Sequence, residues 1–191
     1  MKHNEFKNMK HSIDLISEKD SSYRSIYNLS VWKLSILWEY IQSSLDKNWI
    51  ASNQSSAEAL ILFTSKKNSF LQFCVDYKDL NALTIKNHYS LSLIRETIDQ
   101  LASIKIFTHL NLQDAYHCIQ IQQSNEWKTV FCICYDHFEY HIMFFDLINA
   151  SAIFQVYINC AMTEFLDVIC IVYLNDILIY SCDLKKHAKH I

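Results

Sequence analysis

The sequence predicts an α+β fold in which helices pack on one face of a mainly antiparallel sheet. Hydrophobic residues make up 51% of the 191 residues and aromatic residues 14%, which is enough to build a buried core. Helical and alternating apolar patterns follow one another in the order helix, hairpin, helix, several strands, helix, hairpin. This order is typical of α+β proteins, in which helices cover one face of an antiparallel sheet.

The first part of the chain predicts one helix and one hairpin. Residues 1–27 are polar and weakly patterned, so we expect an extended or poorly ordered lead-in. Residues 30–49 predict an amphipathic helix capped by Ser30, on apolar positions at helical spacing: Leu34, Leu37, Trp38, Ile41 and Leu45. Residues 59–64 and 70–76 predict two strands of a hairpin, whose tip carries Lys66 and Lys67. Lysines at such a tip commonly serve only to keep a sheet edge soluble.

The second part predicts the remaining helices and the sheet. A helix is expected over residues 92–103 and another over about 150–166. Four strands are expected between these helices, near residues 106–112, 117–122, 128–134 and 138–143.

A final hairpin is expected over residues 168–181, where β-branched and aromatic residues are interrupted by Asn175 and Asp176. This pattern places the polar pair at the hairpin tip, where a carboxylate is well placed for a metal ion. The alternative is that Asn-Asp is simply a favourable turn pair.

Charge and cysteine usage exclude several classes of protein. The net charge is −3 and the pI is about 6.3, so any nucleic-acid contact must come from a local patch. With no secretory signal and no long uninterrupted apolar run, we expect an intracellular protein, cytoplasmic or nuclear, without a membrane partner. The seven cysteines include no Cys-x-x-Cys pair and are expected to be reduced. A zinc site is one interpretation of Cys132, Cys134, His137 and His141, and strand alternation explains the cysteine spacing equally well.

The sequence contains no glycine and no proline. Average usage is about 7% glycine and about 5% proline, so their absence is a strong compositional bias. Turns that need a positive φ must therefore be made by Asn, Asp or Ser, or the sequence has been damaged.

Five motifs, in order, resemble one family. They are Cys-Val-Asp-Tyr-Lys-Asp-Leu-Asn at 74–81, Thr-Ile-Lys-Asn at 84–87, Leu-Gln-Asp-Ala-Tyr at 112–116, Met-Phe-Phe-Asp-Leu-Ile-Asn-Ala at 143–150 and Tyr-Leu-Asn-Asp-Ile at 173–177. From about residue 11 to its end the chain resembles the reverse transcriptase of Ty3/gypsy-type long-terminal-repeat retrotransposons. The resemblance implies the fingers and palm of a polymerase with a catalytic-type β-hairpin, and RNA-directed DNA polymerase activity, which is a nucleotidyltransferase reaction.

The resemblance also implies a metal site. In that family three carboxylates at strand ends hold two divalent ions, Mg²⁺ or Mn²⁺, about 4 Å apart. The corresponding positions here are Asn111, Asn175 and Asp176, so one acid of the three is left. We therefore expect the three side chains to converge but the site to be catalytically impaired.

The partners implied are an RNA/DNA primer-template and a deoxynucleoside triphosphate. Tyr116 would lie beneath the ribose as a gate against the 2′-hydroxyl, although ordinary core packing is the alternative for Tyr116 and Phe145. The implied nucleotide-binding residues are Asp114, Ala115, Tyr116 and Phe145 near the sugar and phosphates, with Lys66 or Lys67 and Gln72 at the triphosphate.

The departures from the family pattern follow a rule. Asn replaces Asp at positions 111 and 175, and Gln or Cys replaces Arg at positions 72, 113 and 132. Asp replaces Gly at positions 136 and 146, and Ser or Phe replaces Pro at positions 90, 92, 144 and 151. G-to-A or C-to-T changes explain each of them, as in a transposon copy decayed by the mutational defence of some fungi. Asp136 and Asp146, at glycine positions, are expected to be strained by a positive φ.

These observations predict fingers and palm over residues 28–191, truncated before the thumb, ribonuclease H and integrase. Two alternatives stay open besides an impaired polymerase. One is a non-catalytic nucleic-acid-binding remnant and the other is an inert pseudogene product; the sequence leaves the oligomeric state open.

Overall fold

The structure, a computed structural model, describes residues 9–16, 29–54, 59–65, 71–89, 101–102, 104–133 and 136–191. Lys66 and Lys67 lie outside these residues, as does nearly all of the helix expected over 92–103. The chain forms two compact units. Unit 1 comprises Met1–Met9, Asn87–Ala115 and Ser151–Ile191, and unit 2 comprises Lys10–Lys86 and Tyr116–Ala150. No helix within the described ranges is long and apolar enough to cross a membrane.

Unit 2 is built on a five-stranded sheet. Its strand order is β2 (Ile50–Ser52), β8 (His137–Tyr140), β7 (Phe131–Cys132), β3 (Ala59–Ser65) and β4 (Leu71–Asp76). The expected hairpin is confirmed as β3 and β4, which pair antiparallel. Strands β3 and β7 run parallel and the other three pairings are antiparallel, so this sheet is mixed but mainly antiparallel, as expected. Its core is aromatic, with Phe131, Tyr140 and Phe144 almost fully buried.

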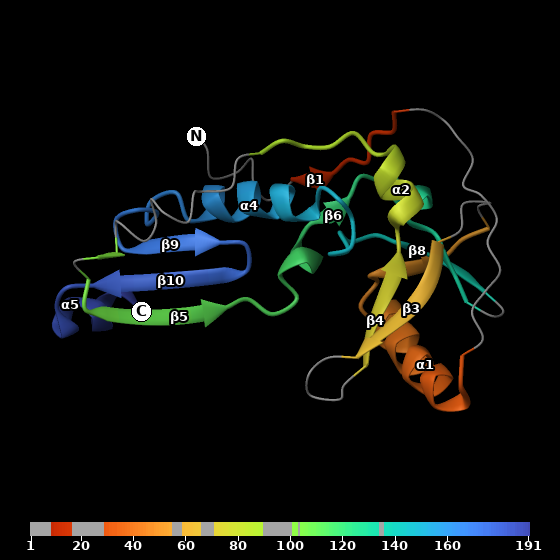
Figure 1. The fold of residues 1–191 in the computed structure, drawn as a ribbon, viewed down its shortest axis with the longest axis horizontal. Helices are drawn as coiled ribbons and strands as arrows, with labels where there is room; N and C mark the ends of the chain where they lie inside the picture. Colours follow the sequence, from red (N-terminus) through yellow and green to blue (C-terminus); the bar gives the residue numbers. More distant parts are fainter. Residues whose placement is uncertain are drawn as a thin grey trace. The chain divides into compact units, whose positions relative to one another are not determined.

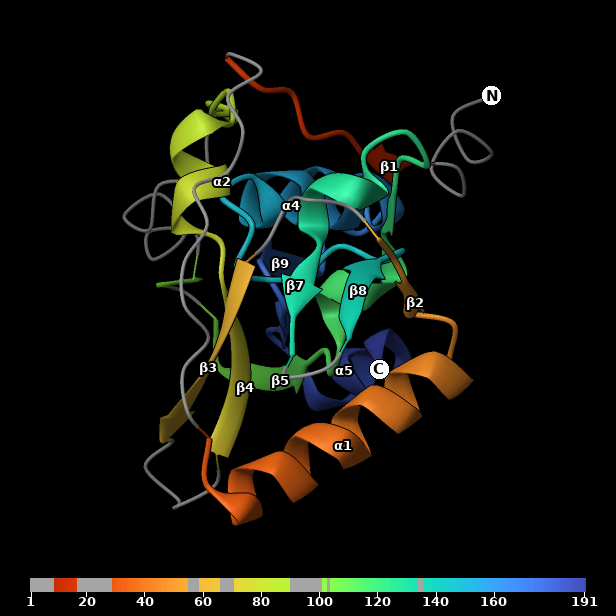
Figure 2. The ribbon, with the colours of Figure 1, turned by 90° about the vertical axis from the view of Figure 1, so that its right-hand side faces the viewer.

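Helix α1 (Val31–Asp46) confirms the helix expected over residues 30–49 and packs on this sheet. The Tyr40 ring stacks on Phe73 of β4 at 4.5 Å, and Figure 2 shows α1 running past the ends of β3 and β4. Its buried residues are Leu37, Ile41 and Ser44. Leu34, Trp38 and Leu45, expected on the buried face, are exposed, because the helix meets the sheet through a narrower stripe centred on Tyr40 and Ile41. Ser30 occupies the N-cap position without a side-chain capping bond.

Residues 9–16, within the expected polar lead-in, are extended and packed. Strand β1 (Lys10–His11) pairs in parallel with β6 (Gln120–Ile121). His11 and Ile13 are each only 1% exposed. The amide of Ile85 donates to the Asp14 carbonyl at 2.8 Å, next to helix α2 (Lys78–Leu83). Tertiary bonds, which a polar local pattern cannot reveal, therefore order this segment.

Two of the expected strands are largely wrong. In place of strands over 117–122 and 128–134 the chain forms the 3₁₀ helices η2 (Ala115–Cys118) and η3 (Glu126–Thr129), each followed by a two-residue strand. The Thr129 hydroxyl donates to the Glu126 carbonyl at 2.7 Å and closes η3. Hydroxyl-to-backbone bonds of this kind compete with a strand ladder, which explains the difference.

Unit 1 contains a three-stranded antiparallel sheet in the order β5 (Ile106–Asn111), β10 (Asp176–Ser181), β9 (Cys170–Tyr173), visible in Figure 1. Helix α4 (Ala150–Ala161) confirms the third expected helix but ends earlier than residue 166. The Thr163 hydroxyl donates to the carbonyls of Asn159 and Cys160 and ends the helix there. Helix α5 (Leu184–His190), which the sequence did not predict, is tied to β5 by a 2.8 Å bond between Thr108 and His187.

The strain expected at Asp136 and Asp146 is absent. Among the described residues a positive φ occurs at Asn48, Asp114, Asp167 and Leu174. The Asp146 carboxylate instead accepts a bond from the Val75 amide at 3.3 Å, and its carbonyl accepts one from Asn81 at 2.8 Å. Burial raises the pKa of Asp146. An aspartate at this position is therefore held by hydrogen bonds in ordinary backbone geometry.

Candidate functional site

The hairpin expected over residues 168–181 is confirmed, with its turn one residue earlier than expected. Asp176 pairs with Tyr173, so Leu174 and Asn175 form the two-residue loop and Asp176 is the first residue of β10. Leu174 has a φ of 52°, which type II′ turns require at their first central position and for which glycine is favoured. The turn therefore accepts some strain to present Asn175 and Asp176 at the strand end.

Strand β5 brings Asn111 to this turn. Asn111 is the last residue of β5 and pairs directly with Asp176 across the sheet. Its side-chain Nδ2 donates to Asp176 Oδ1 at 2.7 Å. The backbone carbonyl of Asn175 accepts a bond from the Leu112 amide at 2.8 Å. The structure thus brings Asn111, Asn175 and Asp176 together at one edge of the unit 1 sheet.

His109 is a fourth member of this edge that the sequence reasoning missed. Its Nε2 donates to Asp176 Oδ1 at 2.9 Å. His109 and Asn111 are two residues apart on β5 and therefore share one face of the strand, which is the signal that could have identified it. The bonds from Asn111 and, second, from His109 lower the pKa of Asp176. Asp176 is consequently an ionised carboxylate with two donors on one oxygen.

These residues do not fit a site for two divalent cations. Mg²⁺ selects anionic oxygen ligands, and this edge supplies one carboxylate. The Asn111 amide turns its N–H donors, not its oxygen, toward Asp176. The second donor, His109, engages the same carboxylate oxygen. Both hydrogen bonds thus fall on one oxygen of the single carboxylate, and one carboxylate does not supply the anionic ligands that two divalent cations need.

Gln155 of α4 supports the turn from inside unit 1. It is 2% exposed, its Oε1 accepts from the Leu174 amide at 2.7 Å, and its Nε2 donates to the Val172 carbonyl at 3.1 Å. The end of β9 and the first residue of the β9–β10 turn therefore share one buried amide side chain as their partner.

Replacing Gln155 by leucine should lower the free energy of unfolding by about 2 kcal/mol, since the Leu174 amide and the Val172 carbonyl lose their side-chain partner. Urea denaturation followed by circular dichroism measures this change. Gln123→Leu, at an exposed position, is the control and should change stability by less than about 0.5 kcal/mol. Equal midpoints for the two variants would show that Gln155 does not support the turn.

The residues expected around the nucleotide are divided between the two units. Asp114 is exposed with a φ of 50°, and Ala115 is buried at the start of η2; both belong to unit 1. Tyr116 and Phe145 belong to unit 2 and are half-buried, so neither is a fully buried core residue. Gln72 is half-buried on β4, opposite Thr64. Their assignment to one pocket is still a prediction.

The zinc interpretation of Cys132, Cys134, His137 and His141 gains no support among the described residues. Cys132 is buried on β7 and pairs across the sheet with His137, and Cys134 lies outside the described ranges. His141 lies beside Glu126 and Glu139 instead.

Comparison with known proteins gives consistent results. Residues 65–191 match the family model described as "Reverse transcriptase (RNA-dependent DNA polymerase)". The Tf2-3 and Tf2-4 transposon polyproteins of Schizosaccharomyces pombe are each 32% identical to the chain over 165 residues, which cover 86% of the chain. The chain spans only 12% of the length of these relatives.

Solved structures with a similar fold include two of the foamy viral protease-reverse transcriptase. One is a complex with an RNA/DNA hybrid, at a TM-score of 0.80 and 15% identity. The other is the native prototype foamy virus protein, at a TM-score of 0.80 and 17% identity. Each match covers 94% of this chain and 24% of the other.

Proposed function

Because the chain belongs to the family of reverse transcriptases (RNA-dependent DNA polymerases), we propose that it is a reverse-transcriptase domain whose metal site is impaired. The family generally uses divalent metals. In this proposal Asn111, Asn175 and Asp176 occupy the ligand positions. Asp114, Ala115, Tyr116, Phe145, Gln72 and Lys66 or Lys67 occupy the nucleotide positions. The partners are an RNA/DNA primer-template and a deoxynucleoside triphosphate.

The observation that carries the proposal is the 2.7 Å bond from Asn111 Nδ2 to Asp176 Oδ1. Two carboxylates at this separation would repel each other unless a cation lay between them. An amide beside a carboxylate needs no cation, because its own N–H group supplies the attraction. Hydrogen bonds within the protein therefore satisfy these side chains without a cation. One negative charge also cannot balance the two dications that nucleotidyl transfer uses.

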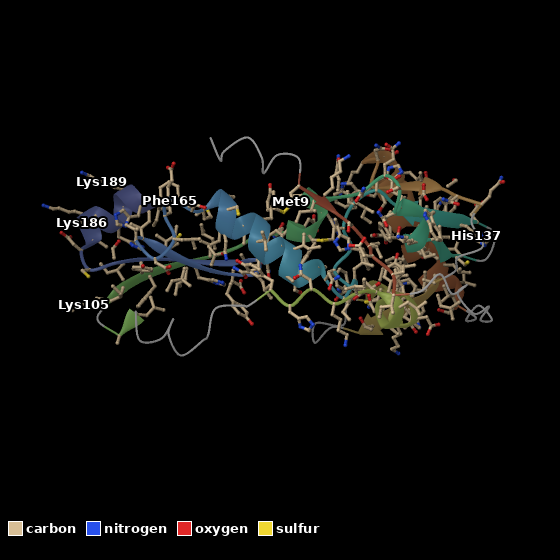
Figure 3. All side chains as sticks on the ribbon, turned by 90° about the horizontal axis from the view of Figure 1, so that it is seen from above. Met9, Lys105, His137, Phe165, Lys186 and Lys189 are labelled. Atoms are coloured by element: carbon tan, nitrogen blue, oxygen red, sulfur yellow. The ribbon has the colours of Figure 1, made fainter. Side chains whose placement is uncertain are left out.

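Binding of a primer-template without catalysis is the second candidate, and a local basic group supports it. Lys105 precedes β5, and Lys186 and Lys189 lie on α5; all three are exposed. Figure 3 shows them at the same end of unit 1. A group of lysines can contact phosphates in spite of the net charge of −3. The solved relative bound to an RNA/DNA hybrid supports the same class of partner.

The purified chain should show no template-directed primer extension above background in Mg²⁺ or Mn²⁺, since two ligand positions carry no charge. The same preparation should retain an RNA/DNA primer-template in a filter-binding assay, with an affinity that falls as salt rises. Measured incorporation of deoxynucleotides would contradict the impaired site. Absence of any salt-dependent retention would contradict the second candidate.

A further inference from the structure

Glu126, Glu139 and His141 bring two carboxylates and an imidazole together in unit 2. One ligand atom of each residue lies within 4.8 Å of the other two. Glu126 begins η3, Glu139 lies on β8, and His141 directly follows β8. All three are half-buried. None of them belongs to the edge formed by Asn111 and Asp176.

The β8 strand directs two of these side chains to the same side. Glu139 and His141 are two residues apart, so they project from one face, while Phe138 and Tyr140 are buried on the other. The backbone on both sides of His141 is fixed. Its amide donates to the Trp49 carbonyl at 2.8 Å, and its carbonyl accepts from the Ile121 amide at 2.9 Å.

The buried Thr129 hydroxyl joins η3 to β8. It donates to the Glu126 carbonyl at 2.7 Å and accepts from the Tyr140 amide at 2.9 Å. Thr129 is 0% exposed. These two bonds place the backbone of Glu126 next to Tyr140, the residue between Glu139 and His141 in the sequence. This bridge fixes the three backbone positions of the cluster before any ligand binds, which lowers the ordering cost of binding.

Glu139 is oriented by a further contact. The side-chain amide of Asn53 donates to one oxygen of the Glu139 carboxylate, Oε2. A bond of this kind fixes the carboxylate and leaves its other oxygen available as a ligand. Outer hydrogen bonds of ligating carboxylates and histidines are characteristic of metal sites in proteins. A cluster of acidic side chains alone would lack both this support and the imidazole.

The cluster places two carboxylates beside one imidazole. Burial raises the pKa of Glu126, and the nearby Glu139 raises it further, while His141 and Lys10 act in the opposite direction. A dication would balance the two carboxylates and leave the imidazole neutral. Imidazole with carboxylates suits zinc, whereas Mg²⁺ prefers oxygen ligands alone. Ligands of tetrahedral zinc lie about 3.4 Å apart, so ligand atoms that lie up to 4.8 Å apart must approach by up to about 1.4 Å.

We propose that Glu126, Glu139 and His141 bind one zinc ion, with water at the open position, and that the ion fastens η3 to β8. A ligand that binds only the folded state stabilises a protein, and this stabilisation grows with the logarithm of the ratio of the ligand concentration to the dissociation constant. Zinc should therefore raise the melting temperature of the chain.

The test uses the purified full chain, stripped with a chelator and kept reduced. Isothermal titration with Zn²⁺ should give one site per folded chain, and thermal melting should shift upward and saturate at one equivalent. His141→Ala and Glu126→Gln should each lower the affinity by more than about 100-fold. Asn53→Ala, which removes the outer contact, should lower it by about tenfold. His137→Ala changes a histidine at the start of β8 that lies outside the cluster; this variant is the matched control and should bind as the wild type does.

Cobalt distinguishes this site from any metal held by cysteine thiolates. Co²⁺ bound at the proposed site should show visible d–d bands without a sulfur-to-cobalt charge-transfer band. Circular dichroism of each variant shows whether it is folded before titration. Unchanged zinc affinity in folded His141→Ala, a sulfur-to-cobalt band, or no stoichiometric binding to the folded wild type would each overturn the proposal.

Discussion

The double variant Asn111→Asp, Asn175→Asp should extend a primer in Mg²⁺ at least about 100-fold faster than the unchanged chain. Metal ions contribute several kcal/mol of transition-state stabilisation in such sites, and each 1.4 kcal/mol corresponds to about tenfold in rate. In the unchanged chain Asn111 donates directly to Asp176 at 2.7 Å. With acids at positions 111 and 175, the edge would carry three carboxylates whose repulsion a cation can relieve.

The matched control is Asn48→Asp, Asn87→Asp, which adds the same charge at two exposed positions that are not among the candidate ligand residues. It should extend no more primer than the unchanged chain. Thermal melting supplies a second measurement that does not require catalysis. Without divalent ions the Asn111→Asp, Asn175→Asp variant should melt at a lower temperature than the control. Mg²⁺ should raise its melting temperature to that of the control. If melting responds to Mg²⁺ but synthesis does not appear, the metal assignment stands and the remaining nucleotide assignments are wrong. If neither responds, the ligand positions themselves are wrong.

The elements that could be predicted from the sequence are those with a long regular pattern. Helix α1, helix α4, the β3–β4 hairpin and the final hairpin each contain enough periodic residues to specify their own structure. Strand β1, with two residues, and helix α5 have no such pattern. They form because partners distant in sequence satisfy them, as β6 does for β1 and as Thr108 does for α5.

The candidate site was predictable in part for the same reason. Asn111 and Asp176 lie at strand ends, which the sequence predicts because a polar residue there follows an apolar run. The role of His109 depends on the antiparallel register that places its ring within 2.9 Å of Asp176, and register is a tertiary property. The Glu126, Glu139 and His141 cluster likewise depends on η3, a 3₁₀ helix that the sequence did not predict.

The structure also bears on how the chain tolerates the loss of glycine and proline. Phe144, where the resemblance implies a proline, is 2% exposed and stacks on Tyr140 at 4.7 Å. Asp146, where the resemblance implies a glycine, accepts a bond from the Val75 amide in ordinary backbone geometry. Positive φ values fall at Leu174 and Asp114 instead, close in sequence to the ligand positions. Two of the four positive φ values among the described residues thus lie close in sequence to the candidate site, whereas Asn48 and Asp167 lie elsewhere in the sequence.

Acid should destabilise unit 2 through His11, and His11→Phe should remove much of that effect. His11 is 1% exposed, its Nδ1 has no hydrogen-bond partner, and burial lowers its pKa from 6.5 to about 4, although Asp14 partly opposes this shift. Between these values the unfolded chain binds a proton that the folded chain does not. Stability is therefore lost as the pH falls from 6.5 to about 4. At about 1.4 kcal/mol per pKa unit, the loss amounts to about 3 kcal/mol.

Urea denaturation at pH 7 and at pH 4.5, followed by circular dichroism, measures this effect. The loss of unfolding free energy between the two conditions should be smaller in His11→Phe than in the unchanged chain by about 2 to 3 kcal/mol. His88→Gln, at an exposed histidine, should leave the loss unchanged. If His11→Phe is folded at pH 7 and shows the full acid loss, another group is responsible. The buried, neutral His11 side chain would then not account for the loss of stability of unit 2 in acid.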